Sequence, residues 1–339
     1  MRSPLNKRLF RELRGEFGKY LVIFILMTLT IGMVSGFLVA DGSMIQAYEE
    51  SFEKYNIENG HFRTEKKMNN AQIQDIEDLG IKLYENYYVE EALTNGSTMR
   101  IFKNRDEVNK VCLMKGKMPE KPGEIGIDRM YADNNDLSVG DEIESDGRTW
   151  KITGLVALSD YSALFSNNND SMFDSVKFGV SVVCPEEFDS YKADQLNYSY
   201  AWKYNTEPKN EKAEKDISED LMENVAKEVT LEEFVPRYTN QAIIFTGDDM
   251  GGDRSMMIVL LYIIIVIMAF VFAITTSNTI RKEANVIGTL RASGYMRGEL
   301  IRHYMTAPVF VTFIGAIIGN IIGYTVGKDY CAGLYYGSY

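Results

Sequence analysis

The stretch YLVIFILMTLTIGMVSGFLVA, residues 20–40, is an uncharged run of 21 residues near the start of the chain. A helix rises about 1.5 Å per residue, so this run is long enough to cross a hydrocarbon core of roughly 30 Å. Two further uncharged runs lie near the end of the chain, and within them we assign spans to residues 255–276 and 304–327. Buried helices of soluble proteins seldom need more than about 18 uncharged residues. The sequence therefore predicts three transmembrane helices.

A cleaved signal peptide is the alternative for the first run, because basic residues precede it and the small residue Ala40 ends it. Signal peptides have apolar cores of about 7–15 residues and an A-x-A-like cleavage site. The run is longer than such a core, and Leu38 stands two residues before Ala40. We therefore expect a retained membrane anchor.

The distribution of Lys and Arg predicts how the chain is oriented. Residues 1–19 carry six basic residues against two acidic ones, and residues 277–303 carry five against two. The positive-inside rule places both segments in the cytoplasm. Residues 41–254 then form an extracytoplasmic domain, and residues 328–339 form an extracytoplasmic tail.

The predicted extracytoplasmic domain is acidic, with 43 Asp and Glu against 24 Lys and Arg. Phosphate binding needs a basic footprint, so this charge argues against nucleic acid as a partner. The charge is compatible with a cationic ligand such as a basic peptide. It also serves solubility, which is the commoner role of a high net charge.

The domain is long enough for one or two subdomains, and its aromatic and β-branched content predicts ordered, mixed α/β structure. The run MIQAYEESFEKY, residues 44–55, has helical spacing and continues the first span outward. Residues 69–80 predict a helix capped by Asn69 or Asn70 and stopped by Gly80, and another helix is predicted from about residue 207. The apolar stripes of these two helices are Ile73, Ile76 and Leu79, and Ala213, Ile217, Leu221 and Val225.

Alternating segments predict strands in the middle of the domain. KLYENYYVEEAL, residues 82–93, and STMRIFKN, residues 97–104, alternate well enough to pair. DEIESDGRTWKITGLVAL, residues 141–158, predicts a hairpin whose turn is Asp146 and Gly147. The polar segment 166–175 is either a plain surface loop or a lip beside a binding surface.

No catalytic or metal-binding constellation is visible in the sequence. The only histidines are His61 and His303. The only cysteines, Cys112, Cys184 and Cys331, are too few and too scattered for a zinc site or a disulfide framework. The chain also lacks the G-x-x-x-x-G-K-[ST] loop that holds nucleotide phosphates. We predict a non-catalytic protein without a cofactor or metal of its own.

Small residues recur every four positions in two of the predicted spans. Such faces let helix backbones approach closely, although glycine is also common in membrane helices generally. No charge inside the spans marks an ion path. We expect packing faces at Thr28, Gly32, Gly36 and Ala40 in the first span and at Gly315, Gly319, Gly323 and Gly327 in the third.

The loop SNTIRKEANVIGTLRASGYMRGELIRHY, residues 277–304, is more distinctive than a plain basic hairpin. We expect the second span to continue as a helix and to break between Gly288 and Gly294. A short helix then lies near the inner membrane surface, where its arginines face lipid headgroups. These arginines are Arg281, Arg291, Arg297 and Arg302.

In this loop the sequence resembles the FtsX-like, or MacB-type, permeases of ABC transporters. Their signature is an acid-rich helix followed by I-G-x-L-R-A-x-G. Its places are filled here by Ile287, Gly288, Leu290, Arg291, Ala292 and Gly294. Val286 replaces the acid that commonly precedes the Ile-Gly pair, and Glu283 is the nearest acid. The outer domain resembles the MacB-type core domain through Gly116, Pro119, Gly123, Glu124, Ile125, Val139, Gly140 and Asp141.

The resemblance implies a multi-pass permease subunit in a bacterial plasma membrane, with its N-terminus in the cytoplasm. It implies that a separate ABC ATPase uses the ATP and binds the loop between Glu283 and Gly294. A second permease copy or half then completes the membrane part. The family exports, extracts or senses peptides, lipoproteins or drug-like substrates. Because the family has a fourth span, we expect this chain to be the N-terminal portion of a longer permease; a natural three-span protein is the alternative.

An alternative from another class is an ATPase-independent receptor or scaffold, anchored in the lipid bilayer, whose acidic outer domain binds a partner. The two classes differ in what the spans do. Spans without charged residues fit mechanical transmission better than conduction.

Overall fold

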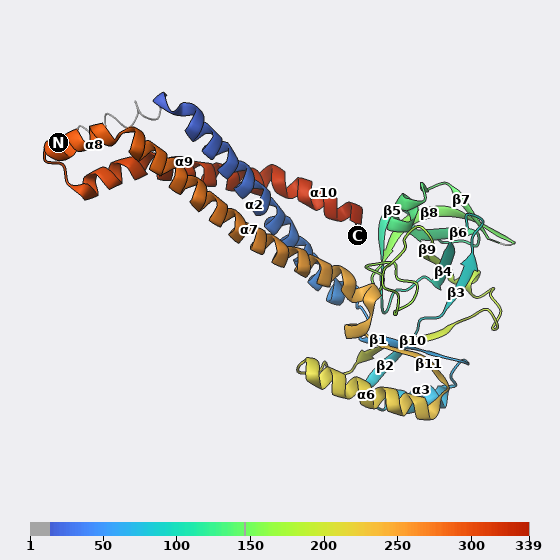
Figure 1. Cartoon of the computed structure of the whole chain (residues 1–339). Coiled ribbons are helices and arrows are strands. Elements are labelled where there is room, and N and C mark those ends of the chain that lie inside the picture. Colours follow the sequence, from blue (N-terminus) through green and yellow to red (C-terminus); the bar gives the residue numbers. More distant parts are fainter. Residues whose placement is uncertain (1–13, 146, 339) are drawn as a thin grey trace. The chain divides into compact units, whose positions relative to one another are not determined.

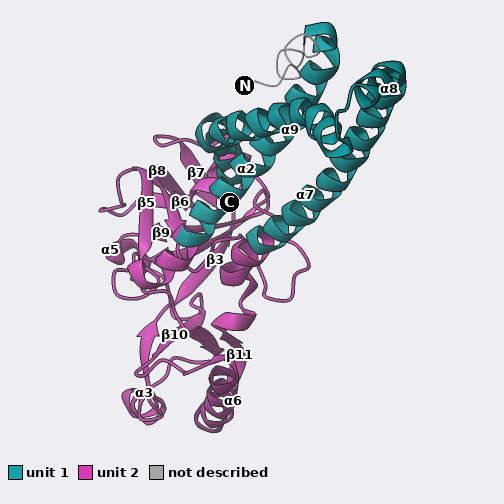
Figure 2. Ribbon diagram, turned by 90° about the vertical axis from the view of Figure 1, so that its left-hand side faces the viewer, with its two compact units in different colours: residues 1–46, 250–337 teal, residues 47–249, 338–339 magenta. Residues whose placement is uncertain are grey.

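The computed structural model describes residues 14–145 and 147–338. They form two compact units (Figure 2). One is helical and contains residues up to 46 and residues 250–337, and the other is α/β and contains residues 47–249. Most of the basic residues of the predicted cytoplasmic N-terminus, and Asp146 of the predicted turn, lie outside the described residues.

Three long helices dominate the helical unit (Figure 1). Within the described residues, these three are the helices that are long and apolar enough to cross a membrane, and each contains one of the predicted spans. A short helix follows the second of them, and a π-helical turn continues the third. The elements are α2 (Phe17–Lys54), α7 (Gln241–Lys282), α8 (Ala284–Ala292), α9 (Arg297–Ile322), η2 (Gly323–Gly327) and α10 (Lys328–Ser338).

The helices extend beyond the predicted spans. α2 continues past Ala40 to Lys54, as the helical spacing after the first span predicts. α7 begins at Gln241, inside the segment assigned to the outer domain, and the exposed Asp248 and Asp249 do not interrupt it. Hydropathy marks only the part of a helix that lies in lipid, so the polar extensions are not visible to it. As a result, α2 and α7 each contribute residues to both units.

The α/β unit contains a four-stranded antiparallel sheet with two helices on one of its faces (Figure 1). The strand order is β11-β1-β10-β2. Phe62, Tyr200 and Trp202 are buried in it, and the rings of Phe62 and Tyr200 stack with centroids 5.6 Å apart. Side chains alternate along a strand, so His61 and Arg63 point away from Phe62. The elements are β1 (Gly60–Thr64), α3 (Asn70–Glu77), β2 (Ile81–Glu85), β10 (Tyr198–Tyr204), α6 (Glu211–Glu228), β11 (Leu231–Pro236) and η1 (Arg237–Thr239).

A seven-stranded mixed sheet makes up most of the remaining α/β unit. Its order is β3-β4-β9-β6-β8-β5, with β7 paired to β8. β4 runs parallel to β9 and β6 parallel to β8. Every residue of β9 is buried, as expected of a strand that is covered on both faces. The elements are β3 (Tyr88–Ala92), β4 (Thr98–Lys103), β5 (Val111–Gly116), β6 (Glu124–Asp128), α4 (Arg129–Asn134), β7 (Glu142–Ser145), β8 (Arg148–Leu158), β9 (Phe178–Val183) and α5 (Pro185–Phe188).

The segment predicted as one strand over residues 82–93 is divided between the two sheets. β2 pairs with β10 in the four-stranded sheet, and only β3 pairs with β4 as predicted. Between β2 and β3 the chain passes from one sheet to the other. Here the Asn86 N–H donates to the Ser199 carbonyl at 2.9 Å, and Arg105 donates to the Asn86 side chain at 2.9 Å. Apolar and polar residues keep alternating where the chain passes between the sheets, so the sequence pattern alone does not reveal the change of sheet.

The hairpin predicted at residues 141–158 is confirmed. β7 pairs with β8 from Glu142 opposite Lys151 to Ser145 opposite Arg148. Gly147 has a φ of +96°, in the left-handed region that so tight a turn requires. The turn residues therefore set the register of this pair.

The helix predicted at residues 69–80 is confirmed, but its apolar stripe is shorter. The Asn69 side chain caps α3 by accepting from the N–H groups of Ala71 and Gln72, and the helix ends at Glu77. Ile76 is fully buried, whereas Leu79 is 45% exposed. The prediction for Leu79 is wrong because the chain leaves helical geometry before this residue can face the core.

The predicted stripe of α6 is right for Leu221 and Val225, which are buried, and wrong for Ile217. Ser218 is buried instead, with its hydroxyl 2.8 Å from that of Tyr238, and Ile217 is 40% exposed. A helix has 3.6 residues per turn, so every fourth position drifts around it. A stripe assigned at strict intervals of four therefore leaves the buried face after two or three steps.

Asp128 ends β6 and caps α4, accepting hydrogen bonds from the N–H groups of Met130 at 2.8 Å and Tyr131 at 3.2 Å. Burial raises the pKa of this carboxyl from 3.8 to about 6. Between these two values the folded protein keeps a proton that the unfolded chain releases. Charging the carboxyl therefore destabilises the folded state as the pH rises through 6.

We predict that Asp128→Asn raises the free energy of unfolding by about 1–3 kcal/mol near pH 8, and that the gain shrinks toward pH 4. Asparagine keeps the cap without the buried charge. Urea unfolding of the full chain in detergent micelles, followed by tryptophan fluorescence, measures the effect. The protein's two tryptophans, Trp150 and Trp202, are both buried in the α/β unit. The prediction is contradicted if the free energy of unfolding changes with pH in the same way in Asp128→Asn and in the parent protein.

Candidate functional site

The loop between the second and third spans is organised around α8, a helix in which no residue is buried. Figure 2 shows α8 at one end of the helical unit. The helix ends in a Schellman motif. The Gly294 N–H donates to the Arg291 carbonyl at 3.1 Å, and the Tyr295 N–H donates to the Leu290 carbonyl at 3.2 Å. Gly294 has a φ of +95°, which explains the need for glycine there.

The break predicted between Gly288 and Gly294 is wrong in its first half. α8 runs through Gly288 and ends at Ala292, because a single glycine lowers helix stability by only about 1 kcal/mol. A Cβ added at Gly288 would meet no atom within 4 Å. Nothing in the described part of the chain therefore requires glycine at this position.

The other residues of the predicted coupling motif lie on or beside α8. Ile287 and Leu290 are half-buried, and Arg291 and Ala292 are exposed. Glu283, the acid nearest to the motif, precedes the helix and accepts a hydrogen bond of 2.6 Å from the Tyr304 hydroxyl. This carboxylate thus anchors the start of α8 to α9.

A second set of contacts links the start of α2 to the end of α7. Lys19 Nζ donates to Thr279 Oγ1 at 2.5 Å, and Lys282 Nζ lies 3.3 Å from Glu16 Oε1. Lys19 also pairs with Glu16 at 3.0 Å, and its hydrogen bond lowers the pKa of Glu16. The charged Glu16 therefore bridges the two helices.

The small residues predicted to form packing faces meet where α2 crosses α9 and the π-helical turn η2 that continues it. A Cβ added at Gly319 would lie 2.8 Å from the Thr28 carbonyl oxygen. One added at Gly323 would lie 2.6 Å from the Gly32 carbonyl oxygen and 2.9 Å from the Gly36 nitrogen. These neighbours are backbone atoms, which cannot move aside as a flexible side chain can. We call this contact the glycine seam, and its members are Thr28, Gly32, Gly36, Gly315, Gly319, Gly323 and Gly327.

The Thr28 hydroxyl adds a hydrogen bond of 3.4 Å to the Gly315 carbonyl across the seam. The remaining faces of the spans are apolar and exposed. Only 11% of the apolar window of α7 is buried, and Tyr262 and Phe270 are more than 60% exposed. Such surfaces are stable in lipid or against other membrane helices.

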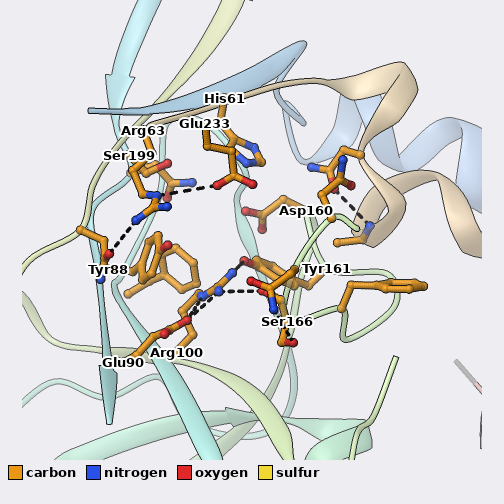
Figure 3. A pocket seen from close by; sticks show the side chains of 18 residues that line it. His61, Arg63, Tyr88, Glu90, Arg100, Asp160, Tyr161, Ser166, Ser199 and Glu233 are labelled. Carbon is orange, nitrogen blue, oxygen red and sulfur yellow. Dashed lines mark hydrogen bonds and ion pairs between the residues drawn. The ribbon is translucent and has the colours of Figure 1, made fainter. Parts of the chain in front are cut away.

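A polar pocket of about 280 Å³ lies in the α/β unit, between its two sheets (Figure 3). Residues two apart on a strand point to the same side, and the pocket is lined by such pairs. The pairs are His61 and Arg63 on β1, Tyr88 and Glu90 on β3, and Arg100 and Phe102 on β4. Ser166, Asn167 and Asn168 also line it, so the polar segment 166–175 supplies the lip that one of its two interpretations predicts.

Several charged side chains at the pocket are paired with each other. Arg100 donates to Glu90 Oε1 at 2.9 and 2.6 Å and to the Tyr161 hydroxyl at 2.7 Å. Arg105 holds Asp160 through two hydrogen bonds of 2.7 Å, and both side chains are buried. These two pairs, of which that between Arg105 and Asp160 is bidentate, fix the wall of the pocket that belongs to the seven-stranded sheet.

His61 lies beside a fully buried carboxylate. Its Nδ1 is 2.6 Å from Glu58 Oε1, and the Asn109 amide donates to Glu58 Oε2 at 2.6 Å. Burial disfavours the charged imidazole, but the neighbouring Glu58 outweighs burial and raises the pKa of His61. For the same reason the pKa of Glu58 is lowered despite its burial. His61 and Glu58 thus form a pair at the edge of the pocket.

The sequence does not single out the pocket residues. Their only local signal is the pairing of polar residues two apart on predicted strands, such as Tyr88 and Glu90. Such pairs are common on solvated sheet faces. The pairs come together because the chain passes from one sheet to the other, and no local sequence pattern marks the residues where it does so.

Comparison with known proteins identifies the C-terminal part of the chain. Residues 258–336 match the family model described as FtsX-like permease C-terminal, which confirms the resemblance found in the coupling loop. No curated protein matches the chain.

Among solved structures, the chain is similar to the periplasmic region of MacB from Actinobacillus actinomycetemcomitans. The identity is 11% and the TM-score 0.29, over 50% of this chain and 86% of that one. It is also similar to the extracellular domain of the noncanonic ABC-type transporter YknZ from Gram-positive bacteria. Here the identity is 10% and the TM-score 0.26, over 51% of this chain and 100% of that one.

We predict that Gly323→Leu weakens the helical unit by about 1–3 kcal/mol, because its side chain would collide with the backbone of α2. Far-UV circular dichroism during heating in detergent micelles should show a lower unfolding midpoint. Gly333→Leu in α10 is the matched control, since a Cβ added there meets no atom within 4 Å. Equal midpoints for the two variants would refute the importance of the seam.

Proposed function

We propose that this chain, which carries an FtsX-like permease segment at residues 258–336, is the permease subunit of an ABC transporter. In this proposal a separate ABC ATPase hydrolyses the ATP, and the chain transmits the resulting motion to its outer α/β unit. The observation that carries the proposal is that the family match includes α8, an exposed helix between two membrane-spanning helices.

Two properties of α8 support its role as the dock for the ATPase. A helix that buries no residue in its own chain contributes little to the core, so the exposed parts of its apolar side chains are available to a partner. Ile287 and Leu290, which are half-buried, offer such parts. The helix is nevertheless well defined, because Glu283 and Tyr304 fix its start and the Schellman motif at Gly294 fixes its end.

The contacts within the helical unit support transmission of motion. The glycine seam joins α2 to α9 through backbone atoms, and the contact of Lys19 with Thr279 joins α2 to α7. A displacement of α8 would therefore reach all three spans. α2 and α7 are also the helices that continue into residues of the α/β unit.

The exposed apolar surface of α7 supports a further partner in the membrane. We propose that a second permease copy or half packs against part of this surface and that lipid covers the rest. The substrate on this proposal is an exported, extracted or sensed peptide, lipoprotein or drug-like molecule. The acidic surface of the outer unit favours a cationic one by electrostatic steering.

We predict that Gly288→Leu reduces ATP hydrolysis by the ATPase that co-purifies with this chain about tenfold or more, because it places a bulky side chain in the dock. The space around Gly288 is open, so the fold of the chain itself should be unaffected. Hydrolysis is measured in nanodiscs, and the unfolding midpoint is measured on the same preparation. Gly333→Leu serves as the control with the same chemical change away from α8.

Two results would count against the proposal. One is unaltered hydrolysis by the Gly288→Leu complex. The other is the absence of any ABC ATPase that binds the chain, which would favour a membrane-anchored receptor or scaffold.

A further inference from the structure

The face of the four-stranded sheet that looks into the pocket carries an unusual row of side chains. In the register of the sheet, Arg63 on β1 stands opposite Ser199 on β10 and opposite Glu233 on β11. All three line the pocket, and Figure 3 shows them on the same wall. A hydroxyl, a guanidinium and a carboxylate therefore stand side by side across three strands.

The hydrogen-bonding groups of this row are only partly used by contacts within the protein. Arg63 Nη1 is 3.0 Å from Glu232 and donates to the Asn197 side chain at 3.3 Å. Arg63 Nε is buried and has no hydrogen-bond partner in the part of the chain that the structure describes. The nearest acidic oxygen, on Glu233, is 3.7 Å away, which is too far for a hydrogen bond. Although Arg63 Nη1 is paired with Glu232, the Nε–H therefore stays unused beside the Glu233 carboxylate and can donate to a ligand.

Arg63 differs in this respect from the other arginine of the pocket. Arg100 makes two hydrogen bonds to Glu90, one to Tyr161 and one of 2.8 Å to the Ser166 carbonyl. These contacts hold the Arg100 guanidinium against the wall of the pocket. The unused N–H of Arg63 and the neighbouring carboxylate of Glu233 therefore lie on the four-stranded sheet.

We propose that this pocket binds a free α-amino acid. The ligand carboxylate lies against Arg63 and the Ser199 hydroxyl, and the ligand ammonium lies against Glu233. In an α-amino acid the two charged groups are attached to one carbon, so they need a cation and an anion that are neighbours. The separation of 3.7 Å between Arg63 Nε and Glu233 meets this requirement.

The size and the lining of the pocket fit the same class of ligand. Pockets for drug-sized molecules measure about 300–1,000 Å³, and this one, at about 280 Å³, lies just below that range. A folded peptide or a lipid chain would not fit inside it. Across the pocket, Tyr88, Phe165 and the Asn167 amide offer both aromatic and polar contacts to the side chain of the ligand.

The experiment uses the purified full chain in detergent micelles without an ATPase, so its outcome does not depend on the proposed transport function. Each of the twenty amino acids is titrated by isothermal calorimetry. We expect at least one to bind at millimolar or lower concentration. Its N-acetyl derivative, which lacks the ammonium, and its amide, which lacks the carboxylate, should each bind about tenfold more weakly or worse.

Variants then test the row itself. Arg63→Gln and Glu233→Gln should each weaken binding about tenfold or more, because each removes one charge-assisted contact. Arg148→Gln is the matched control, since Arg148 is 29% exposed against 30% for Arg63 and is also paired with a glutamate, at 2.7 Å. It lies outside the pocket lining and should bind as the parent does. Glu233→Gln preserves the shape of its side chain, so the test remains valid if Arg63→Gln fails to fold.

The proposal is overturned if no amino acid binds the parent protein at millimolar concentration. It is also overturned if the N-acetyl derivative or the amide binds as tightly as the free amino acid. Binding that is lost in Arg148→Gln to the same extent as in Glu233→Gln would likewise exclude this pocket as the site.

Discussion

Where α2 and α9 cross, carbonyl oxygens of one helix face the Cα atoms of the other with no side chain between them. The Gly32 carbonyl oxygen would be 2.6 Å from a Cβ on Gly323, so no other residue type fits without a shift of the backbone. Two helices in lipid gain nothing from the hydrophobic effect when they associate, and dispersion and weak Cα–H···O contacts take its place. Both require close approach. The glycine seam thus supplies an attraction that larger apolar side chains would prevent.

A tight contact between two helices also determines what the rest of the helical unit can do. Because α2 is in backbone contact with α9 and η2, there is little room for these helices to shift against each other along the seam. α7 joins them through polar contacts near Lys19 and Thr279, at the end of the unit that carries α8. The large exposed apolar surface of α7 is then free for lipid or another membrane helix. The tight contact of α2 with α9 and the exposed apolar surface of α7 are compatible with a helical unit that packs against further membrane helices.

The parts of this structure that the sequence predicts are those set by short-range rules. Lipid requires long uncharged helices, and the close crossing requires small residues four apart, so the spans and the members of the seam follow from spacing alone. The turn at Gly147 and the cap at Asn69 are similarly local. Gly288 shows the limit of such rules, because the neighbours of a glycine decide whether a helix continues through it.

The parts that the sequence does not predict depend on contacts between distant segments. Residues 82–93 alternate as one strand, yet Asn86 is held by Ser199 and Arg105, which lie far along the chain, and the strand is divided there. The row of Ser199, Arg63 and Glu233 likewise exists only because β1 lies between β10 and β11. Each residue alone resembles an ordinary polar residue of a sheet. Their placement side by side depends on the register of three strands.

The charge of the outer unit and the charge of its pocket act over different distances. The unit is acidic, and its field attracts cations over about 8–10 Å, the range that salt leaves unscreened. Inside the pocket, Arg63 and Arg100 lie near the carboxylates of Glu90, Glu233 and Asp160. Hydrogen bonds away from bulk water are stronger than at the surface and select by geometry. The proposed amino-acid ligand and a cationic ligand attracted by the acidic surface would therefore contact different groups of this unit.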